Sequence, residues 1–392
     1  MVALILLMKV LIVFLSSDLL ARIHSRAAEV DRANAFPDKD LAELKDAGYL
    51  TAFVPKEFGG AGLSTEEIAS EQTRLAQASP ATALSINMHQ IIVGLGLHLV
   101  ANGVDSGRQI LEGAMKGDVF AFGISEPGND RVLFGSIAQA RPDGDGGYTF
   151  HGLKVFTSLS PVWTKLMTYA QDDSGEDGPH SVFAIINRED GGFTINDDWD
   201  TLGMRGTQSN STLLDGAPAS ADQILQRVEP GPSADPVVFG IFSYFEILLA
   251  ATYLGIGNRA IEVAAEKVKT RRSVVRDDVY SNDPDIRWRL GGAAIRMNSA
   301  ASEVTLIARD LDEGRDRGEL WYPQLSAAKN AAAEASLYAV EQSIRSCGGS
   351  SFSNSNELSR LYRDVLAGLF QPSDQESLHG AWANVVLGPV TD

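Results

Sequence analysis

The sequence predicts an α+β chain of three parts: an N-terminal helical domain over residues 1–118, a middle β-domain over 119–228, and a C-terminal helical bundle over 229–392. Apolar residues recur at helical spacing in the first and last parts. β-Branched and aromatic residues dominate the middle part, separated by turns rich in Gly and Asp. With 392 residues, 44% of them apolar, the chain is long enough for two or three domains around a large buried core.

Helical signals are clear in the first part. In the segment GLSTEEIASEQTRLAQAS, Ser64 can cap a helix and Glu67 stands three residues later, which is a capping box. Ile68 and Leu75, with nearby alanines, form one apolar face. The segment MHQIIVGLGLHLVANG, residues 88–103, predicts a second apolar helix.

The first fifteen residues, MVALILLMKVLIVFL, are the one membrane-like feature of the sequence. They are too short for a spanning helix, and Lys9 interrupts them. No basic leader precedes the run and no small-residue cleavage site follows it, so a signal peptide fits poorly. We expect an N-terminal helix packed on the body or on a partner subunit, in a cytoplasmic protein without a membrane role.

Strand signals begin near residue 119. GGYTFHGLKVFTSLS (146–160) and HSVFAIINRED (180–190) read as strands, and RPDGDGG and QDDSGEDGP read as turns. RVEPGPSADP (227–236) resembles a linker. Beyond it, LGIGNRAIEVAAEKVKTRR (254–272) and the Ala-rich segment 325–346 predict helices whose small-residue faces can approach closely in a bundle.

Charge and composition exclude several classes of function. With 33 basic and 51 acidic residues, the formal net charge is −18, which disfavours nucleic acid as a partner. A phosphorylated small ligand held by a few arginines remains compatible. Cys347 is the single cysteine, which rules out an intrachain disulfide and fits a reducing compartment. The six histidines are scattered without ligand spacing, so no metal site is expected.

Nucleophile-elbow, phosphate-loop and dinucleotide-binding signatures are absent from the sequence. Five other motifs occur in order: VPKEFGGAGLS, FGISEPGND, HGLKVFTS, LGMRGT, and CGG closely followed by LYRD. Together, from about residue 40 to the C-terminus, they resemble the acyl-CoA dehydrogenase superfamily. The resemblance implies a barrel- or sandwich-like β-domain, a C-terminal four-helix bundle, FAD held between them, and a homotetramer or homodimer.

The resemblance also assigns residues to the flavin. Ile124 and Ser125 lie in the segment that would contact the pyrimidine side of the ring, although a plain Pro-Gly turn would explain the same letters. Phe156 matches the aromatic residue beside the ring, and Ser158 matches a hydroxyl near flavin N5. An ordinary amphipathic strand is the alternative for this second motif.

A second group of residues would reach the FAD of a neighbouring subunit. Arg271 or Arg272 takes the place of an arginine at the pyrophosphate, and Gly348 and Gly349 match a glycine pair that approaches the same cofactor. Arg345 replaces a glutamine of the family, and a cation beside a pyrophosphate is plausible there. A basic helix end and a simple helix C-cap are the alternatives.

The family's catalytic base is missing from its usual place. Counted from Asp364, the usual Glu falls on Pro372, with Asp374 two residues further on. A minority of the family carries its Glu on the first long helix after the β-domain, which falls on Phe245, with Glu246 adjacent. Glu246 lies in a strongly apolar run, so it serves either as a base or in a buried ion pair with an arginine, unless the helix exposes it.

The first function predicted is therefore an FAD-dependent α,β-dehydrogenation of an acyl-CoA or related acyl thioester, as in fatty acid metabolism, with an acceptor protein or O2 taking the electrons. Glu246 is the preferred base and Asp374 the second candidate. A flavin monooxygenase on the same fold, using reduced flavin and O2 on substrates without CoA, is the alternative. A flavin-binding chain without dehydrogenase activity is the third possibility.

Overall fold

The structure is a computed structural model that describes residues 13–176, 178–231 and 233–390. The apolar stretch expected to form an N-terminal helix lies mostly outside these residues. Its described end, Leu15, is fully buried, and the carboxylate of Glu71 accepts the backbone N–H of Leu15 at 3.1 Å. The chain just before α1 (Ser17–Ala33) is therefore packed against the body of the protein.

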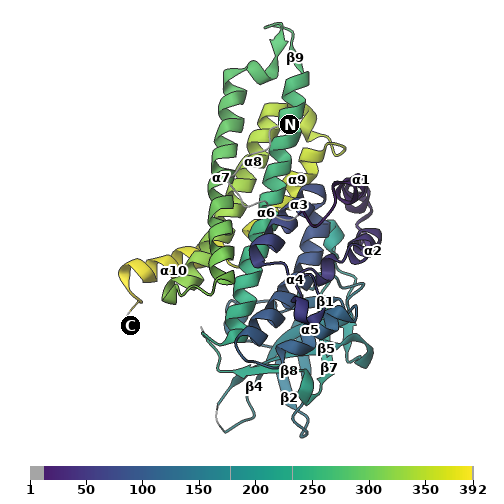
Figure 1. Ribbon diagram of the computed structural model, residues 1–392, viewed down its shortest axis with the longest axis vertical. Coiled ribbons are helices and arrows are strands. Elements are labelled where there is room, and N and C mark those ends of the chain that lie inside the picture. Colours follow the sequence, from purple (N-terminus) through teal and green to yellow (C-terminus); the bar gives the residue numbers. More distant parts are fainter. Residues whose placement is uncertain (1–12, 177, 232, 391–392) are drawn as a thin grey trace.

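Among the described residues, five helices form the first part of the fold (Figure 1). They are α1 (Ser17–Ala33), α2 (Asp38–Asp46), α3 (Thr65–Ala78), α4 (Pro80–Ala101) and α5 (Gly107–Met115). The predicted capping box starts α3: the Ser64 side chain accepts the Glu67 N–H at 3.2 Å, and Glu67 accepts the Ser64 N–H at 2.9 Å.

The middle part is one sheet of eight strands, β1 (Phe120–Gly123), β2 (Gln139–Pro142), β3 (Tyr148–Lys154), β4 (Lys165–Asp172), β5 (His180–Asn187), β6 (Phe193–Ile195), β7 (Thr212–Ala219) and β8 (Ile224–Val228). The strand order is β6-β7-β3-β2-β4-β5-β8, and β1 pairs in parallel with β4. Most neighbours are antiparallel, as the turn-rich sequence between the strands predicts.

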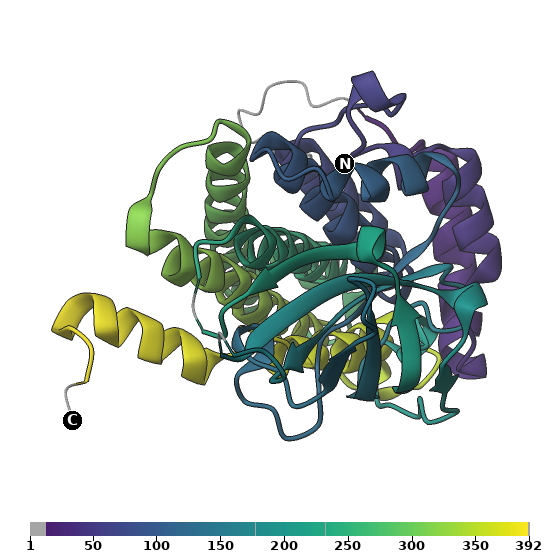
Figure 2. The same ribbon diagram turned by 90° about the horizontal axis from the view of Figure 1, so that it is seen from below.

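The last part is helical again. Three long helices, α6 (Pro236–Thr270), α7 (Pro284–Asp312) and α8 (Trp321–Cys347), run side by side, and the short α9 (Glu357–Val365) packs against α8 and α6 (Figure 1). A small hairpin of β9 (Arg272–Ser273) and β10 (Asp278–Val279) joins α6 to α7. The last helix, α10 (Gln375–Leu387), projects away from the body (Figures 1 and 2).

The last residues of the predicted linker, Asp235 and Pro236, form the start of α6. Asp235 accepts the N–H of Val237 at 2.9 Å, and Pro236 occupies the first turn of α6, where its missing N–H costs nothing. The buried alanines of α8 then let α6 and α8 pack closely, as the small-residue pattern predicts.

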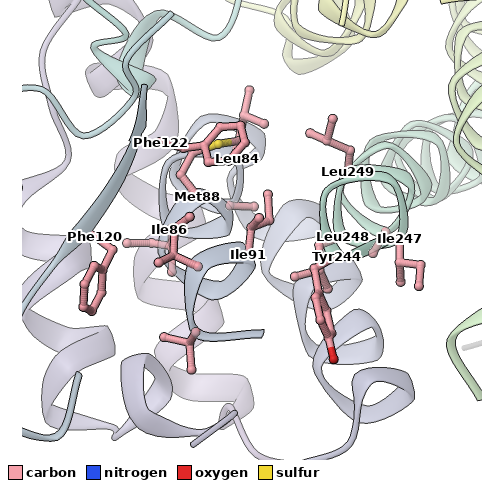
Figure 3. Packing of buried hydrophobic residues seen from close by; sticks show 14 of the residues in the cluster. Leu84, Ile86, Met88, Ile91, Phe120, Phe122, Tyr244, Ile247, Leu248 and Leu249 are labelled. Atoms are coloured by element: carbon pink, nitrogen blue, oxygen red, sulfur yellow. The ribbon is translucent and has the colours of Figure 1, made fainter. Parts of the chain in front are cut away.

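The core continues from the first part into the last. Figure 3 shows Leu84 and Met88 of α4 close to Phe122 of β1, with Tyr244 and its neighbours of α6 facing them. A Cβ at Gly94 would lie 2.7 Å from the ring of Tyr244, so glycine permits this approach of α4 to α6. Phe122 of β1 stacks on Phe245 of α6, with ring centroids 5.6 Å apart, so β1, α4 and α6 meet in one region.

Two described helices, α4 and α6, are long and apolar enough to cross a membrane. In each, 83% of the apolar window is buried inside the protein. Such burial is expected of helices at the centre of a large core, and it explains why neither shows an amphipathic pattern.

Candidate functional site

A cavity of about 420 Å³ lies where the β-domain meets α4, α6 and the segment after α9. Its walls are mostly apolar and carry a few hydroxyl groups. The apolar wall comes mainly from Leu84, Met88, Phe122, Phe156, Trp199, Leu202, Phe245, Leu366, Phe370 and Pro372. The hydroxyl groups belong to Ser125, Ser158, Thr201, Thr207 and Ser209.

The two motifs predicted to contact a flavin meet at this cavity. The backbone N–H of Val155 donates to the carbonyl of Ser125 at 2.9 Å, which joins the end of one motif to the other. Phe156 has a left-handed backbone, with φ of 59°, and leaves 63% of its surface exposed beside the cavity. Its ring stands edge-on to Trp199, with centroids 6.3 Å apart. Ile124 is buried and does not line the cavity.

Each of these two motifs also contributes one member of a buried ion pair, which the sequence analysis did not predict. Lys154 Nζ donates to Glu126 Oε1 at 2.6 Å and to the carbonyl of Tyr169 at 2.7 Å, and both charged side chains are fully buried. Glu126 also accepts the N–H of Ile137 at 2.8 Å and the hydroxyl of Ser136 at 2.5 Å. The pair connects the residue after Ser125 to the residue before Val155.

Electrostatics keep this pair charged. Burial lowers the pKa of Lys154 to about 8, with the charge of Glu126 acting in the other direction. Burial would raise the pKa of Glu126, but the charge of Lys154 and the hydrogen bonds hold that pKa below its ordinary value. The sequence did carry a signal for this pair, because Glu126 and Lys154 are charged residues inside the otherwise apolar segments FGISEPG and HGLKVF.

The two positions at which the sequence resemblance predicts the family's base both line the cavity. Phe245 projects from α6 and Pro372 lies in the turn after α9, and neither side chain accepts a proton. Among the described lining residues there is no Asp or Glu. Arg363 is the charged residue of the wall, and Asp31 pairs with it at 2.9 and 2.5 Å. The cavity therefore presents little net charge.

Neither predicted carboxylate lines this cavity. Glu246 is buried, and its Oε1 accepts both the N–H and the hydroxyl of Ser373, at 2.9 and 2.6 Å. Burial raises the pKa of Glu246, while the charge of Lys329 and the bonds from Ser373 lower it. Its charged neighbour is thus a lysine and not the arginine that the sequence suggested. Asp374 caps α10 by accepting the N–H of Ser377 at 2.9 Å, and the bonds from Ser377 lower its pKa.

The residues predicted to reach a neighbouring cofactor gather elsewhere. Arg271 Nη1 donates to the carbonyl of Cys347 at 2.8 Å, which places it beside Gly348, where φ is 73°. Arg345 is exposed nearby on the last turn of α8. A groove of about 350 Å³ is lined by Lys267, Thr270, Arg271 and Ser350. Along α6 this cluster is about 40 Å from Phe245, so it is a separate surface of the same chain.

Comparison with known proteins identifies the family. Residues 19–111 match the acyl-CoA dehydrogenase N-terminal domain, and residues 237–370 match the acyl-CoA dehydrogenase C-terminal domain. The chain therefore belongs to the acyl-CoA dehydrogenase superfamily, whose members are flavoenzyme oxidoreductases. The predicted family and fold class are confirmed, and so is a flavin as the class of cofactor.

Individual relatives point in two directions. The chain is 29% identical to L-evernosamine nitrososynthase of a Micromonospora species, over 92% of this chain and 85% of that protein. It is 27% identical to the putative acyl-CoA dehydrogenase YdbM of Bacillus subtilis, over 88% of each. A solved structure of KijD3 in complex with FMN and dTDP-3-amino-2,3,6-trideoxy-4-keto-3-methyl-D-glucose superposes with a TM-score of 0.85, at 25% identity, covering 96% of this chain and 93% of that one.

Proposed function

We propose that this protein is a flavin-dependent monooxygenase acting on a small substrate that carries no CoA. One observation carries the proposal: Phe245 and Pro372, which we predict to stand where family dehydrogenases keep a Glu, both line the cavity. Removal of an α-proton needs a base within hydrogen-bond reach of the substrate. The described wall offers no carboxylate for that step.

The residues of the cavity fit an isoalloxazine ring. The ring is flat and largely apolar with polar edges, and the cavity supplies a flat, exposed Phe156 and the hydroxyls of Ser125 and Ser158. These three residues would hold the ring. When bound in its reduced form, flavin supplies two electrons to O2, so that one oxygen atom enters the substrate and the other leaves as water. FAD, as opposed to FMN, stays a prediction, because FMN is the flavin named in the KijD3 complex.

The cavity wall also suggests which atom is oxidised. A nitrogen or sulfur atom with a lone pair can accept oxygen without losing a C–H proton first, so no carboxylate base is needed. No acidic group of the described wall would hold a protonated amine, so an amine substrate would react in its neutral form. The nitrososynthase named among the relatives supports a nitrogen atom as the target. We therefore propose a small, mostly apolar, heteroatom-containing substrate.

Acyl-thioester dehydrogenation remains the second candidate. The similarity to the B. subtilis protein over 88% of its length favours it. It would require Glu246, which follows the lining residue Phe245 on α6, to turn from Ser373 into the cavity.

The deciding experiment compares two half-reactions on the same purified protein. The protein is loaded with FMN or FAD, and anaerobic addition of acyl-CoAs of several lengths is followed by flavin absorbance. In parallel, the protein receives reduced flavin, 18O2 and a panel of amines, indoles and thioethers, and products are analysed by mass spectrometry. We expect no bleaching in the first arm and 18O in a product of the second. Rapid bleaching by an acyl-CoA would overturn the proposal, and flavin binding without either reaction would leave the chain as a binding protein.

A further inference from the structure

Three buried hydroxyl groups form a chain along one wall of the cavity. Ser158 Oγ lies 2.7 Å from Ser209 Oγ, which lies 2.7 Å from Thr207 Oγ1. Thr207 Oγ1 lies 2.9 Å from the carbonyl oxygen of Met204. The three hydroxyl residues are almost fully buried, yet each contributes to the cavity wall. The chain therefore runs from a backbone carbonyl to the cavity.

The carbonyl sets the direction of every bond in this chain. A carbonyl oxygen can only accept, so the single proton of Thr207 is donated to Met204. Thr207 Oγ1 must then accept from Ser209, and Ser209 Oγ must accept from Ser158. Because each hydroxyl has one proton, Ser158 has none left for the cavity. It presents an oxygen lone pair, which is an acceptor.

We propose that this directed hydroxyl chain makes the cavity prefer reduced flavin over oxidised flavin. The inference rests on the proposed function, with the flavin ring beside Phe156 and Ser158. Two-electron reduction places a hydrogen on the central ring nitrogen N5, which then donates. The oxidised ring offers only a lone pair there, and two lone pairs repel each other. A preference for reduced flavin suits an enzyme that receives its flavin already reduced.

The size of the preference for reduced flavin follows from the free energy needed to reverse the three hydroxyl groups. To donate to oxidised flavin, all three hydroxyls must turn, and Thr207 then gives up its bond to Met204. The Met204 carbonyl keeps one partner, the N–H of Thr207 at 3.0 Å, so the loss is one neutral hydrogen bond. A single bond of this kind corresponds to roughly a 2- to 13-fold difference in affinity.

Thr207→Val tests the direction of the chain. Valine matches threonine in shape but offers Ser209 no acceptor. The Ser209 proton is then free to turn to Ser158, its other partner among the described residues, which releases the Ser158 proton for the cavity. The preference should reverse. Thr207→Ser keeps the hydroxyl and is the matched control. Ser209→Ala removes the acceptor of Ser158 directly. It tests the same inference if the valine variant does not fold.

The readout is the midpoint potential of the bound flavin, together with the dissociation constants of its oxidised and reduced forms, measured anaerobically. We expect Thr207→Val and Ser209→Ala to lower the potential, by about 30 mV for a tenfold change in the affinity ratio. Thr207→Ser should match the wild type. Equal potentials in all four proteins, with flavin bound, would overturn the inference and leave the proposed function standing. A wild type that binds neither flavin form would overturn both.

Discussion

Glu246 and Ser373 are joined by two hydrogen bonds, although 127 positions separate them in the sequence. Beside them, Lys329 Nζ donates to the carbonyls of Gly368, Gln371 and Ser373, at 2.9, 2.5 and 3.0 Å. This buried cluster ties α6 and α8 to the turn that carries Pro372. Because Gln371 and Pro372 line the cavity, the cluster shapes one wall of it.

Removing Glu246 should therefore affect stability first. We expect Glu246→Ala to lower the free energy of unfolding by about 3–5 kcal/mol, because Lys329 would lose its buried counter-charge. Glu246→Gln keeps an oxygen acceptor for Ser373, so a smaller loss of about 1–3 kcal/mol is expected. Asp374→Asn preserves the cap of α10 and serves as the control. Urea unfolding measures all three. An alanine variant as stable as wild type would show that the cluster does not hold this wall.

Phe156 should matter for flavin and little for folding. Its ring is 63% exposed, so Phe156→Ala removes few packing contacts. Loss of an aromatic face from the ring-binding wall should weaken flavin binding by roughly 10-fold. Ile295→Ala, at a side chain that is 69% exposed on α7 and lies outside both the cavity wall and the groove beside Arg271, is the control and should change neither property. Flavin titration by fluorescence, with thermal unfolding alongside, distinguishes the two. Equal flavin affinity in both variants would place the ring elsewhere.

The Glu126–Lys154 pair predicts a coupled effect. Lys154→Met leaves a buried carboxylate without its cation, and a loss of about 3–5 kcal/mol in stability is expected. Adding Glu126→Gln to that variant removes the uncompensated charge, so the double variant should be more stable than the sum of the two single losses implies. Flavin affinity should fall with Lys154→Met, because the pair holds the segments of Ser125 and Phe156 together. Additive losses in urea unfolding would argue against direct coupling.

Asp364 predicts a particular pH dependence. Its Oδ1 accepts the N–H of Met204 at 2.6 Å, and burial raises the pKa of Asp364 from 3.8 to about 6. Since the folded pKa is above the unfolded one, the folded chain keeps a proton that the unfolded chain loses. The stabilising contribution is therefore complete below about pH 4 and is lost as the pH rises through about 6.

Comparison with Asp364→Asn isolates this contribution, because asparagine does not titrate. The stability of wild type relative to the variant should fall by up to about 3 kcal/mol between pH 4 and pH 7. Urea unfolding at half-unit pH steps measures the difference. A difference that stays constant with pH would show that Asp364 titrates at its ordinary value.

The tip of the β9–β10 hairpin predicts self-association. Val274 and Val275 are 98% and 96% exposed, and they lie at the same end of the bundle as Arg271. Exposed apolar residues around the residues assigned to a neighbouring cofactor support a homodimer or homotetramer. Light scattering should show a lower mass for Val274→Asp combined with Val275→Asp. Ile137→Asp, at an exposed position in the β-domain, should leave the mass unchanged. A monomeric wild type with flavin bound would contradict this prediction.

Local patterns were enough to predict the order of the elements. The Ser64–Glu67 capping box, the turns between the β-rich segments and the Ala-rich face of α8 are short-range signals, and each appears in the fold as expected. Phe245 and Pro372 could also be singled out from the sequence, by counting residues from neighbouring motifs, and both line the cavity.

The surroundings of these side chains, in contrast, depend on the tertiary structure. Glu246 lies one residue from Phe245, and a helix turns by about 100° per residue, so one side chain enters the cavity while its neighbour meets Ser373 in the core. The bonds of Lys154 to Glu126 and of Ser158 to Ser209 join residues 28 and 51 positions apart. The sequence alone determined which groups the chain carries and in which elements they lie. Their partners, their burial and therefore their chemistry depended on contacts that form only when the β-domain closes against the helices, because burial and pairing set the energy of a polar group.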